Sequence, residues 1–312
     1  MPFAGSADKE WKKKASQLIQ KGIGIMYEEP VGPGWKDPIT GYPYEVLEAQ
    51  YVTLGTMCGG ENFWKDIVEY HEKIGRNVDV QKMSPSLSKE ESQSHKRVFK
   101  SNVFLPKIVG LSGMAGCGKT TMAELAQQEF GYRPLSFASP FKKSLAFLFA
   151  TEPGNFENQD YKKGMAPVGN STVREWLQKF GTEGFGRALH EDYWVKLHQW
   201  FVEKLARKDP DAKFVVPDNR FENEKSYIRE SGGLVIKVVR PGLALDERVS
   251  SHVSERGFLD SEVDFVLNNK GTPRDMLDQF VVAIQTFNEK KRVTGATTLG
   301  LYKNDSSRSW ER

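Results

Sequence analysis

The stretch GMAGCGKTTMAELA, from Gly113 to Ala126, decides the fold class of this chain. Its first eight residues fit the pattern G-x-x-x-x-G-K-[ST], and an apolar segment, KIVGLS at 107–112, comes directly before it. Glycines let a backbone curl so that successive N–H groups point at phosphate oxygens, and the N-terminus of the following helix adds partial positive charge. A strand, a glycine loop and a helix in this order therefore predict a phosphate-binding loop in an α/β fold.

The same loop carries the residues expected to bind a nucleoside triphosphate. Lys119 is expected to reach the β- and γ-phosphates of ATP, and Thr120 to offer its hydroxyl to Mg²⁺. Cys117 is interpreted as a small residue whose backbone matters more than its thiol. The predicted ATP-binding residues of the loop are Gly113, Ala115, Gly116, Cys117, Gly118, Lys119, Thr120 and Thr121.

The composition narrows the class of protein. With 38% hydrophobic and 27% charged residues, the chain has the composition of a soluble protein. Apolar runs are too short to span a membrane, and the start MPFAGSADKEWKKK lacks the apolar core of a signal peptide. The net charge of +3 is too small to indicate nucleic-acid binding. Cys58 and Cys117 suggest a reducing compartment, so we expect a cytoplasmic protein with neither a membrane nor a direct nucleic-acid partner.

Hydrophobic patterning divides the chain into three zones. Residues 1–100 form an N-terminal region that ends in a Ser-rich polar linker at 83–100. Residues 101–288 alternate apolar strands with helices, which predicts a central parallel sheet flanked by helices. Residues 289–312 form a polar tail. Strands are expected at 107–112, 133–137, 213–217, 234–239 and 264–268.

The N-terminal region has no recognisable motif, and its fold and function stay open. Helices are expected over 11–20 and 61–75, with a loop rich in Pro, Gly and aromatic residues at 31–45 between them. Its tryptophans suggest a small packed unit; they are Trp11, Trp35 and Trp64. Four hypotheses stay open for this region: docking on the kinase part of the chain, a homodimer contact, a replication-associated partner, or a remnant.

A carboxylate and a basic residue follow the strand predicted at 213–217. Asp218 comes directly after this strand and Arg220 two residues later. A carboxylate at a strand end beside a phosphate loop can hold a water on Mg²⁺ or orient an acceptor oxygen, and an arginine can fork onto a phosphate. A surface ion pair explains the same two residues equally well.

Two further basic clusters bear on where a phosphate goes. The stretch 172–195 places Arg174 and Arg187 around a Gly-rich turn, which suggests a loop shaped for a ligand, although arginines on a helix are more often a solvated face. After the strand at 234–239, a polar stretch carries Arg240, Arg248 and His252. This stretch is expected to form a lid that closes over phosphates.

Several spaced motifs agree with one known family. They are LSFASPFKKSL (135–145), VREWLQKFGTEGFGR (173–187), VVPDNRFENE (215–224), HVSE (252–255) and VDFVLNNKGT (263–272). Together with the phosphate loop, these motifs resemble the phage-type deoxynucleoside monophosphate kinases of the P-loop kinase superfamily, over about residues 107–287. Ser139 stands where related sequences often carry Asp. The resemblance implies an α/β P-loop kinase with an Arg-bearing lid, which transfers phosphate from ATP to a deoxynucleoside monophosphate with Mg²⁺, in the host cytoplasm if the chain is phage-encoded.

The resemblance also implies roles for residues at matching positions. The implied catalytic residues are Lys119, Asp218, Arg220 and Arg248. The implied substrate-binding residues are Lys142, Arg174, Arg187, Arg220 and Glu224. The lid would carry Arg240, Arg248 and His252, the metal would be held by Thr120 and Asp218, and Asn268 would lie near the adenine of ATP.

Other readings remain open. Dephospho-coenzyme A kinases share a strand ending like the one at Asn268, but they lack the block at 173–187 in this form. A P-loop ATPase that acts on a partner would need a residue that positions water and an arginine finger, and the sequence marks neither. The presence of Lys119, Thr120 and Asp218 argues against an inactive kinase domain. The accepted base is not predicted, because no motif reports the shape of the pocket.

Overall fold

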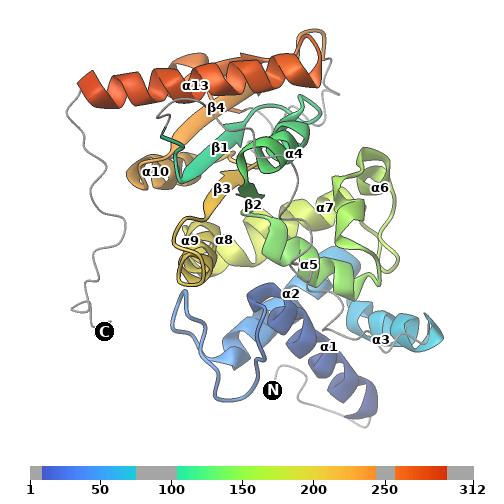
Figure 1. The fold of residues 1–312 in the computed structure, drawn as a ribbon. Helices are drawn as coiled ribbons and strands as arrows, with labels where there is room; N and C mark the ends of the chain where they lie inside the picture. Colours follow the sequence, from blue (N-terminus) through green and yellow to red (C-terminus); the bar gives the residue numbers. More distant parts are fainter. Residues whose placement is uncertain (1–8, 75–103, 244–256, 294–312) are drawn as a thin grey trace. The chain divides into compact units, whose positions relative to one another are not determined.

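The computed structural model describes residues 9–74, 104–243 and 257–293 of the chain (Figure 1). It contains two compact units. The first comprises residues 1–92 and 137–201, and the second comprises residues 93–136 and 202–312.

The second unit is built on a five-stranded sheet with the order β2-β3-β1-β4-β5, in which every pair of neighbours is parallel. The strands are β1 (Ile108–Ser112), β2 (Tyr132–Pro134), β3 (Lys213–Val216), β4 (Leu234–Val239) and β5 (Phe265–Asn268). This sheet confirms the predicted α/β class with a central parallel sheet. All five predicted strands are present, but β2 ends three residues earlier than expected. A further backbone bond follows it, from Leu135 N–H to the Val215 carbonyl at 2.9 Å.

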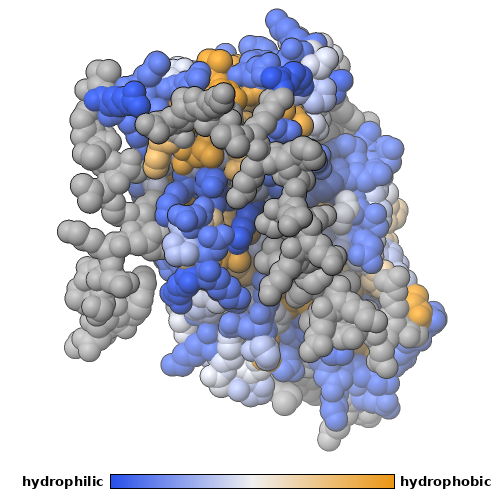
Figure 2. Space-filling model, in the orientation of Figure 1, coloured by the Kyte–Doolittle hydropathy of each residue, from blue (hydrophilic) through white to orange (hydrophobic). Residues whose placement is uncertain are grey.

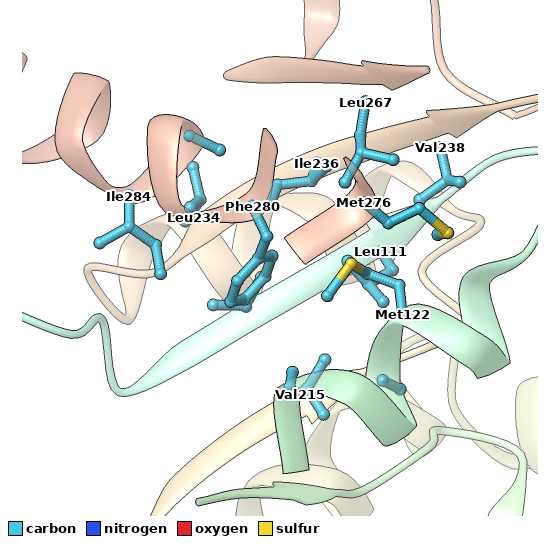
Figure 3. Close-up of a cluster of buried hydrophobic side chains, with 14 of the residues drawn as sticks. Leu111, Met122, Val215, Leu234, Ile236, Val238, Leu267, Met276, Phe280 and Ile284 are labelled. Atoms are coloured by element: carbon cyan, nitrogen blue, oxygen red, sulfur yellow. The ribbon is translucent and has the colours of Figure 1, made fainter. Parts of the chain in front are cut away.

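Helices cover both faces of this sheet. Side chains of successive strand residues point to opposite faces. Val109 and Leu111 belong to a buried cluster with α4 (Lys119–Phe130) and α13 (Pro273–Val293), whereas a side chain at Gly110 would meet Ile228 of α10 (Glu222–Glu230). Figure 3 shows side chains of the buried cluster between these helices and the strands, among them Met122, Val215, Leu234, Ile236, Val238, Leu267, Met276, Phe280 and Ile284. A short 3₁₀ turn, η5 (Asp260–Glu262), precedes β5.

The first unit is helical. Its N-terminal part contains α1 (Lys9–Tyr27), α2 (Tyr44–Gly59) and α3 (Phe63–Ile74), which include the two helices expected there. Residues from 137 onward add α5 (Ser139–Leu148), η3 (Pro153–Glu157), α6 (Gln159–Lys163), α7 (Val173–Gln178), η4 (Lys179–Gly184) and α8 (Gly186–Leu189). The boundary between the units falls within α9 (Tyr193–Ala206).

Two features of the first unit were not expected. Helix α2 was missed because Glu48 and Gly55 interrupt the apolar stripe on its buried face. The Gly-rich stretch after α7, which was expected to be a loop, forms a π-helical turn, η4. The compact units also differ from the zones expected from hydrophobic patterning. The N-terminal helices share a compact unit with residues 137–201.

The surface is largely polar where it can be seen. On the face drawn in Figure 2, the described residues are mostly hydrophilic, with smaller hydrophobic areas between them. Among the helices of the described segments, none is both long enough and apolar enough to cross a lipid bilayer.

Candidate active site

The phosphate loop has the geometry that its sequence predicts. Strand β1 ends at Ser112, α4 begins at Lys119, and Gly113, Gly116 and Gly118 adopt φ values of +130°, +78° and +107°. Side chains rarely tolerate this left-handed region, which glycine enters freely. At Gly113 there is no room for a side chain either, since an added Cβ would lie 2.3 Å from the Val238 carbonyl oxygen. The loop is therefore a tight turn that requires glycine and leads directly into a helix N-terminus.

The ammonium group of Lys119 lies against the backbone of this loop. Its Nζ donates to the carbonyl oxygens of Gly113 and Met114, both at 2.7 Å, and the residue is only 8% exposed. Thr120 and Thr121 follow on the exposed side of the first turn of α4. A lysine held in this way has its charge placed at the loop before any phosphate arrives.

Asp218 lies at the same edge of the sheet as the phosphate loop. It follows β3, which pairs in parallel with β1, so the carboxyl ends of both strands meet at one edge. Its Oδ2 accepts a hydrogen bond from Ser136 Oγ at 2.5 Å. Ser136 follows β2, the neighbour of β3, and sequence reasoning had given it no role.

Arg220 is positioned by a buried carboxylate. Glu224, 3% exposed, accepts the backbone N–H groups of Arg220 and Phe221 on its Oε2, at 2.7 and 3.0 Å. These bonds satisfy backbone donors at the start of α10. Glu224 was expected to bind substrate, and that role stays a prediction; the contacts shown here support the backbone of Arg220.

The two asparagines at the end of β5 have different surroundings. The backbone of Asn268 is held by Gln279, with Asn268 N–H to Oε1 and Nε2–H to the Asn268 carbonyl both at 2.9 Å, while the residue itself is exposed. Asn269 turns toward the phosphate loop, where its Nδ2 donates to the carbonyl of Cys117 at 2.9 Å. Sequence reasoning singled out Asn268 and missed Asn269. The available signal was its place directly after a strand of the sheet whose central strand, β1, leads to the loop.

Part of the predicted lid lies outside the described residues. Arg248 and His252 fall in the range 244–256, so the structure tests neither of them. Arg240 lies within the described residues, directly after β4, and is exposed.

The chain on both sides of this range passes beside the phosphate loop. A Cβ added at Gly116 would lie 3.7 Å from Leu243 Cδ1, and one added at Gly257 would lie 3.5 Å from the Cα of Gly113.

Three predicted substrate-binding residues belong to the first unit. Lys142 Nζ pairs with Glu157 Oε1 at 2.7 Å, and Arg174 Nη2 donates to Gln159 Oε1 at 2.8 Å. Both therefore contact the short stretch 157–159. Arg187 Nη1 donates to the carbonyl of Glu191 at 3.3 Å. The loop residues, Asp218, Arg220 and Asn268 belong to the second unit.

Thr120 and Asp218 suit a magnesium ion that takes most of its ligands from phosphate oxygens and water. Within the segments that the structure covers, no group of three or more His, Cys, Asp or Glu side chains could hold a metal ion. Mg²⁺ is commonly held by one or two side chains together with phosphate oxygens and water. Thr120 and Asp218 at one edge of the sheet fit that arrangement.

A parallel sheet whose central strand leads into a G-x-x-x-x-G-K-T loop defines a P-loop nucleotide-binding protein. Comparison with known proteins places the chain within that class. The sequence model of the family described as deoxynucleotide monophosphate kinase matches residues 156–280. A putative deoxynucleotide monophosphate kinase of Acanthamoeba polyphaga mimivirus is 30% identical over 191 residues, covering 57% of this chain and 95% of the relative. The chain therefore belongs to the deoxynucleotide monophosphate kinase family, and it is a phosphotransferase.

Two other similar proteins were found. The deoxynucleotide monophosphate kinase of Enterobacteria phage T4 is 29% identical over 237 residues, covering 55% of this chain and 96% of that protein. Among solved structures, a dephospho-CoA kinase from Campylobacter jejuni covers 62% of this chain and 100% of its own, at 17% identity and a TM-score of 0.31. That score is too low to support a conclusion. The family expected from the spaced motifs is thus confirmed.

Proposed function

We propose that this enzyme transfers the γ-phosphoryl group of ATP to the 5′-phosphate of a deoxynucleoside monophosphate, with Mg²⁺ held by Thr120 and Asp218. The observation that carries the proposal is the phosphate loop after β1 with Asp218 at the end of the neighbouring strand, in a chain of this family. The residue roles that follow are proposals argued from this geometry.

The donor side would be formed by the phosphate loop. Lys119 now donates to two neutral carbonyl oxygens, and an anionic phosphate oxygen is a stronger acceptor than either. We therefore expect the ammonium group to turn toward the β- and γ-phosphates when ATP binds. Mg²⁺, when bound, would neutralise charge on these phosphates. Asn268, exposed at the end of β5, would lie near the adenine.

The acceptor side needs positive charge more than a base. A phosphate monoester has a second pKa of about 6, so near neutral pH its attacking oxygen mostly carries no proton. Asp218 would then act by holding the metal or orienting the acceptor, and not by removing a proton. Arg220, whose backbone is fixed by Glu224, would pair with the acceptor phosphate. Lys142, Arg174 and Arg187, which belong to the first unit, stay predicted acceptor residues on the strength of the family resemblance. Catalysis would consist of positioning and charge stabilisation.

We also infer a cytoplasmic location. Cys58 and Cys117 are both buried thiols, which suits a reducing compartment. A homodimer contact or a replication-associated partner stays a hypothesis that rests on no contact of the described residues.

The test is ADP release from Mg-ATP with a panel of acceptors. The panel contains dGMP, dTMP, dCMP and dAMP, their ribonucleotide forms, dephospho-coenzyme A, and no acceptor. Release that depends on one or more deoxynucleotides, and that stops when EDTA removes Mg²⁺, supports the proposal and identifies the base. Release without acceptor would instead indicate an ATPase, and release with dephospho-coenzyme A alone would indicate the other kinase. Lys119→Ala, purified in parallel, controls for contaminating kinases.

A further inference from the structure

We propose that the N-terminal helices position the deoxynucleotide side of the enzyme, and that Tyr51 of α2 is the positioning residue through which they act. This inference rests on the proposed function, because it assumes that Lys142, Arg174 and Arg187 bind the acceptor. It gives a role to the region before residue 75, for which the sequence offered none.

Tyr51 connects several segments of the first unit. It is 1% exposed, and its hydroxyl forms a hydrogen bond with Ser144 Oγ of α5 at 2.7 Å. The ring packs edge-on against Phe180 and Phe185, with centroid distances of 5.3 and 4.9 Å and interplanar angles of 86° and 78°. The hydroxyl also lies 3.9 Å from Met26 Sδ of α1. Burial raises the pKa of Tyr51 above its ordinary value, so its hydroxyl stays neutral and available for hydrogen bonding.

The two phenylalanines that Tyr51 contacts bracket the π-helical turn before Arg187. Phe180 lies within η4, and Phe185 separates η4 from α8, whose second residue is Arg187. Helix α2 contacts this turn a second time, since a Cβ added at Gly184 would lie 2.8 Å from Leu54 Cδ1. π-helical turns are rare and are frequently found at functional sites. The packing of α2 against η4 therefore stabilises a turn that sets the direction of Arg187.

The other two basic residues are supported from the same region. Lys142 lies on α5, two residues before Ser144, and α1 approaches this helix so closely that a Cβ at Gly22 would lie 3.1 Å from Ser144 Oγ. The next residue, Lys143, pairs with Glu28 at 2.6 Å.

Arg174 is supported through α3. It lies two residues before the buried Trp176, whose ring centroid is 4.7 Å from that of Phe63. Each of the three acceptor residues predicted in the first unit thus lies on or beside an element that packs on an N-terminal helix.

The packing of the N-terminal helices matters for the reaction because binding of a phosphate depends on the orientation of the basic groups. Charge-assisted bonds from arginine to phosphate depend on the direction of the planar guanidinium group, and a displacement of about 1 Å can cost about 10²-fold in rate. A loosened η4 or α5 would move these groups without unfolding the sheet. The Michaelis constant for the deoxynucleotide should rise, while that for ATP should stay nearly constant.

The experiment compares Tyr51→Leu and Tyr51→Phe with the wild-type enzyme, measuring KM for the deoxynucleotide, KM for ATP, kcat and the thermal midpoint. Leucine removes the edge-on ring contacts and the hydroxyl, and we expect KM for the deoxynucleotide to rise about tenfold. Phenylalanine removes only the hydroxyl, and we expect a rise of about threefold. Both variants should leave KM for ATP within about twofold. Tyr42→Leu and Tyr42→Phe are the matched controls, since Tyr42 is 44% exposed, and they should change neither constant.

The hydrogen bond itself can be tested as a pair. Ser144→Ala should raise KM for the deoxynucleotide as much as Tyr51→Phe does, and the double variant should be no worse than either single one, because all three lose the same bond.

Several outcomes would overturn the inference. Equal rises in both Michaelis constants would show general destabilisation, and unchanged values would show that the contacts do not matter. If Tyr51→Leu has no cooperative thermal transition, the phenylalanine variant decides, and an unchanged KM for the deoxynucleotide refutes the role.

Arg187→Ala separates this inference from the proposed function. If Arg187→Ala raises KM for the deoxynucleotide and the Tyr51 variants do not, only the positioning role fails. A wild-type enzyme without deoxynucleotide-dependent turnover refutes the proposed function, and this inference with it.

Discussion

Replacing Asn269 with alanine should weaken ATP binding, whereas the same change at Asn268 should alter the choice between ATP and GTP. The two residues are adjacent and identical in type, so the contrast depends wholly on the structure. Asn269 holds the phosphate loop through the Cys117 carbonyl, at 2.9 Å. Asn268 is exposed, and its backbone is held by Gln279, so truncating its side chain leaves the end of β5 in place.

The size of the effect follows from one hydrogen bond. A neutral hydrogen bond contributes about 1 kcal/mol net, and an acceptor left without a partner in a buried site costs ~1–3 kcal/mol. Asn269 is only partly buried, so water can reach part of the vacated space, and the lower part of this range applies. A loss of ~1.4 kcal/mol corresponds to about a tenfold weaker affinity.

The assay measures KM for ATP and for GTP at a saturating deoxynucleotide concentration, with a coupled readout of ADP or GDP. Binding of a non-hydrolysable ATP analogue gives Kd directly, because KM equals Kd only when chemistry is slow. Asn269→Ala should raise both Michaelis constants by the same factor, since the phosphates are common to both nucleotides. Asn268→Ala should change their ratio. If Asn269→Ala binds the analogue as tightly as the wild-type enzyme, the Asn269–Cys117 contact does not support the loop and the reasoning is wrong.

Three further predictions follow from the site and the packing. Lys119→Ala should lower kcat by roughly 10³-fold with an unchanged thermal midpoint, and turnover near the wild-type level would rule out the proposed donor site. Arg220→Ala should lower kcat/KM for the deoxynucleotide by roughly 10- to 100-fold while KM for ATP stays constant, and an unchanged acceptor KM and kcat would count against its role. Burial lowers the pKa of His71, whose Nε2 lies 2.9 Å from the Leu148 carbonyl, so below an ordinary pKa of 6.5 the unfolded chain binds a proton that the folded chain resists. The thermal midpoint should therefore decrease as the pH is lowered from 7 to 5, and the decrease should be smaller in His71→Gln. Parallel curves of thermal midpoint against pH for the wild-type enzyme and His71→Gln would contradict this.

Local patterns predicted much of the fold. The five strands and the phosphate loop were found from short apolar runs and from a motif of eight residues, whose conformation depends on neighbours in the sequence. Helix α2 was not predicted because its buried face contains Glu48 and Gly55. In the sequence these residues indicate a polar or flexible segment, and only their tertiary contacts explain their burial. Glu48 is buried because it accepts a hydrogen bond from Ser16 of α1. The π-helical turn was not predicted for a similar reason, because Tyr51 and Leu54, which pack against it, lie much earlier in the sequence.

The candidate site shows the same division between local and distant contacts. Lys119 was identified from the motif, and Asp218 from the strand before it. Glu224 was predicted to bind substrate, which no contact tests, and the structure adds that it supports the backbone of Arg220 at the start of α10. The predicted lid residues Arg248 and His252 lie outside the described segments, so their roles stay predictions.

The sequence by itself determined the class of this protein: a P-loop kinase with a parallel sheet, a lysine in the loop and a carboxylate after a neighbouring strand. These features are encoded in contiguous residues, because a glycine turn and a helix start depend on local backbone preferences. Only the tertiary structure decided that Asn269 rather than Asn268 holds the loop, 152 residues away from Cys117, and that the N-terminal helices pack on the elements carrying Lys142, Arg174 and Arg187. Contacts between distant segments form when a whole unit buries its apolar surface, and no short pattern reports which segments will meet.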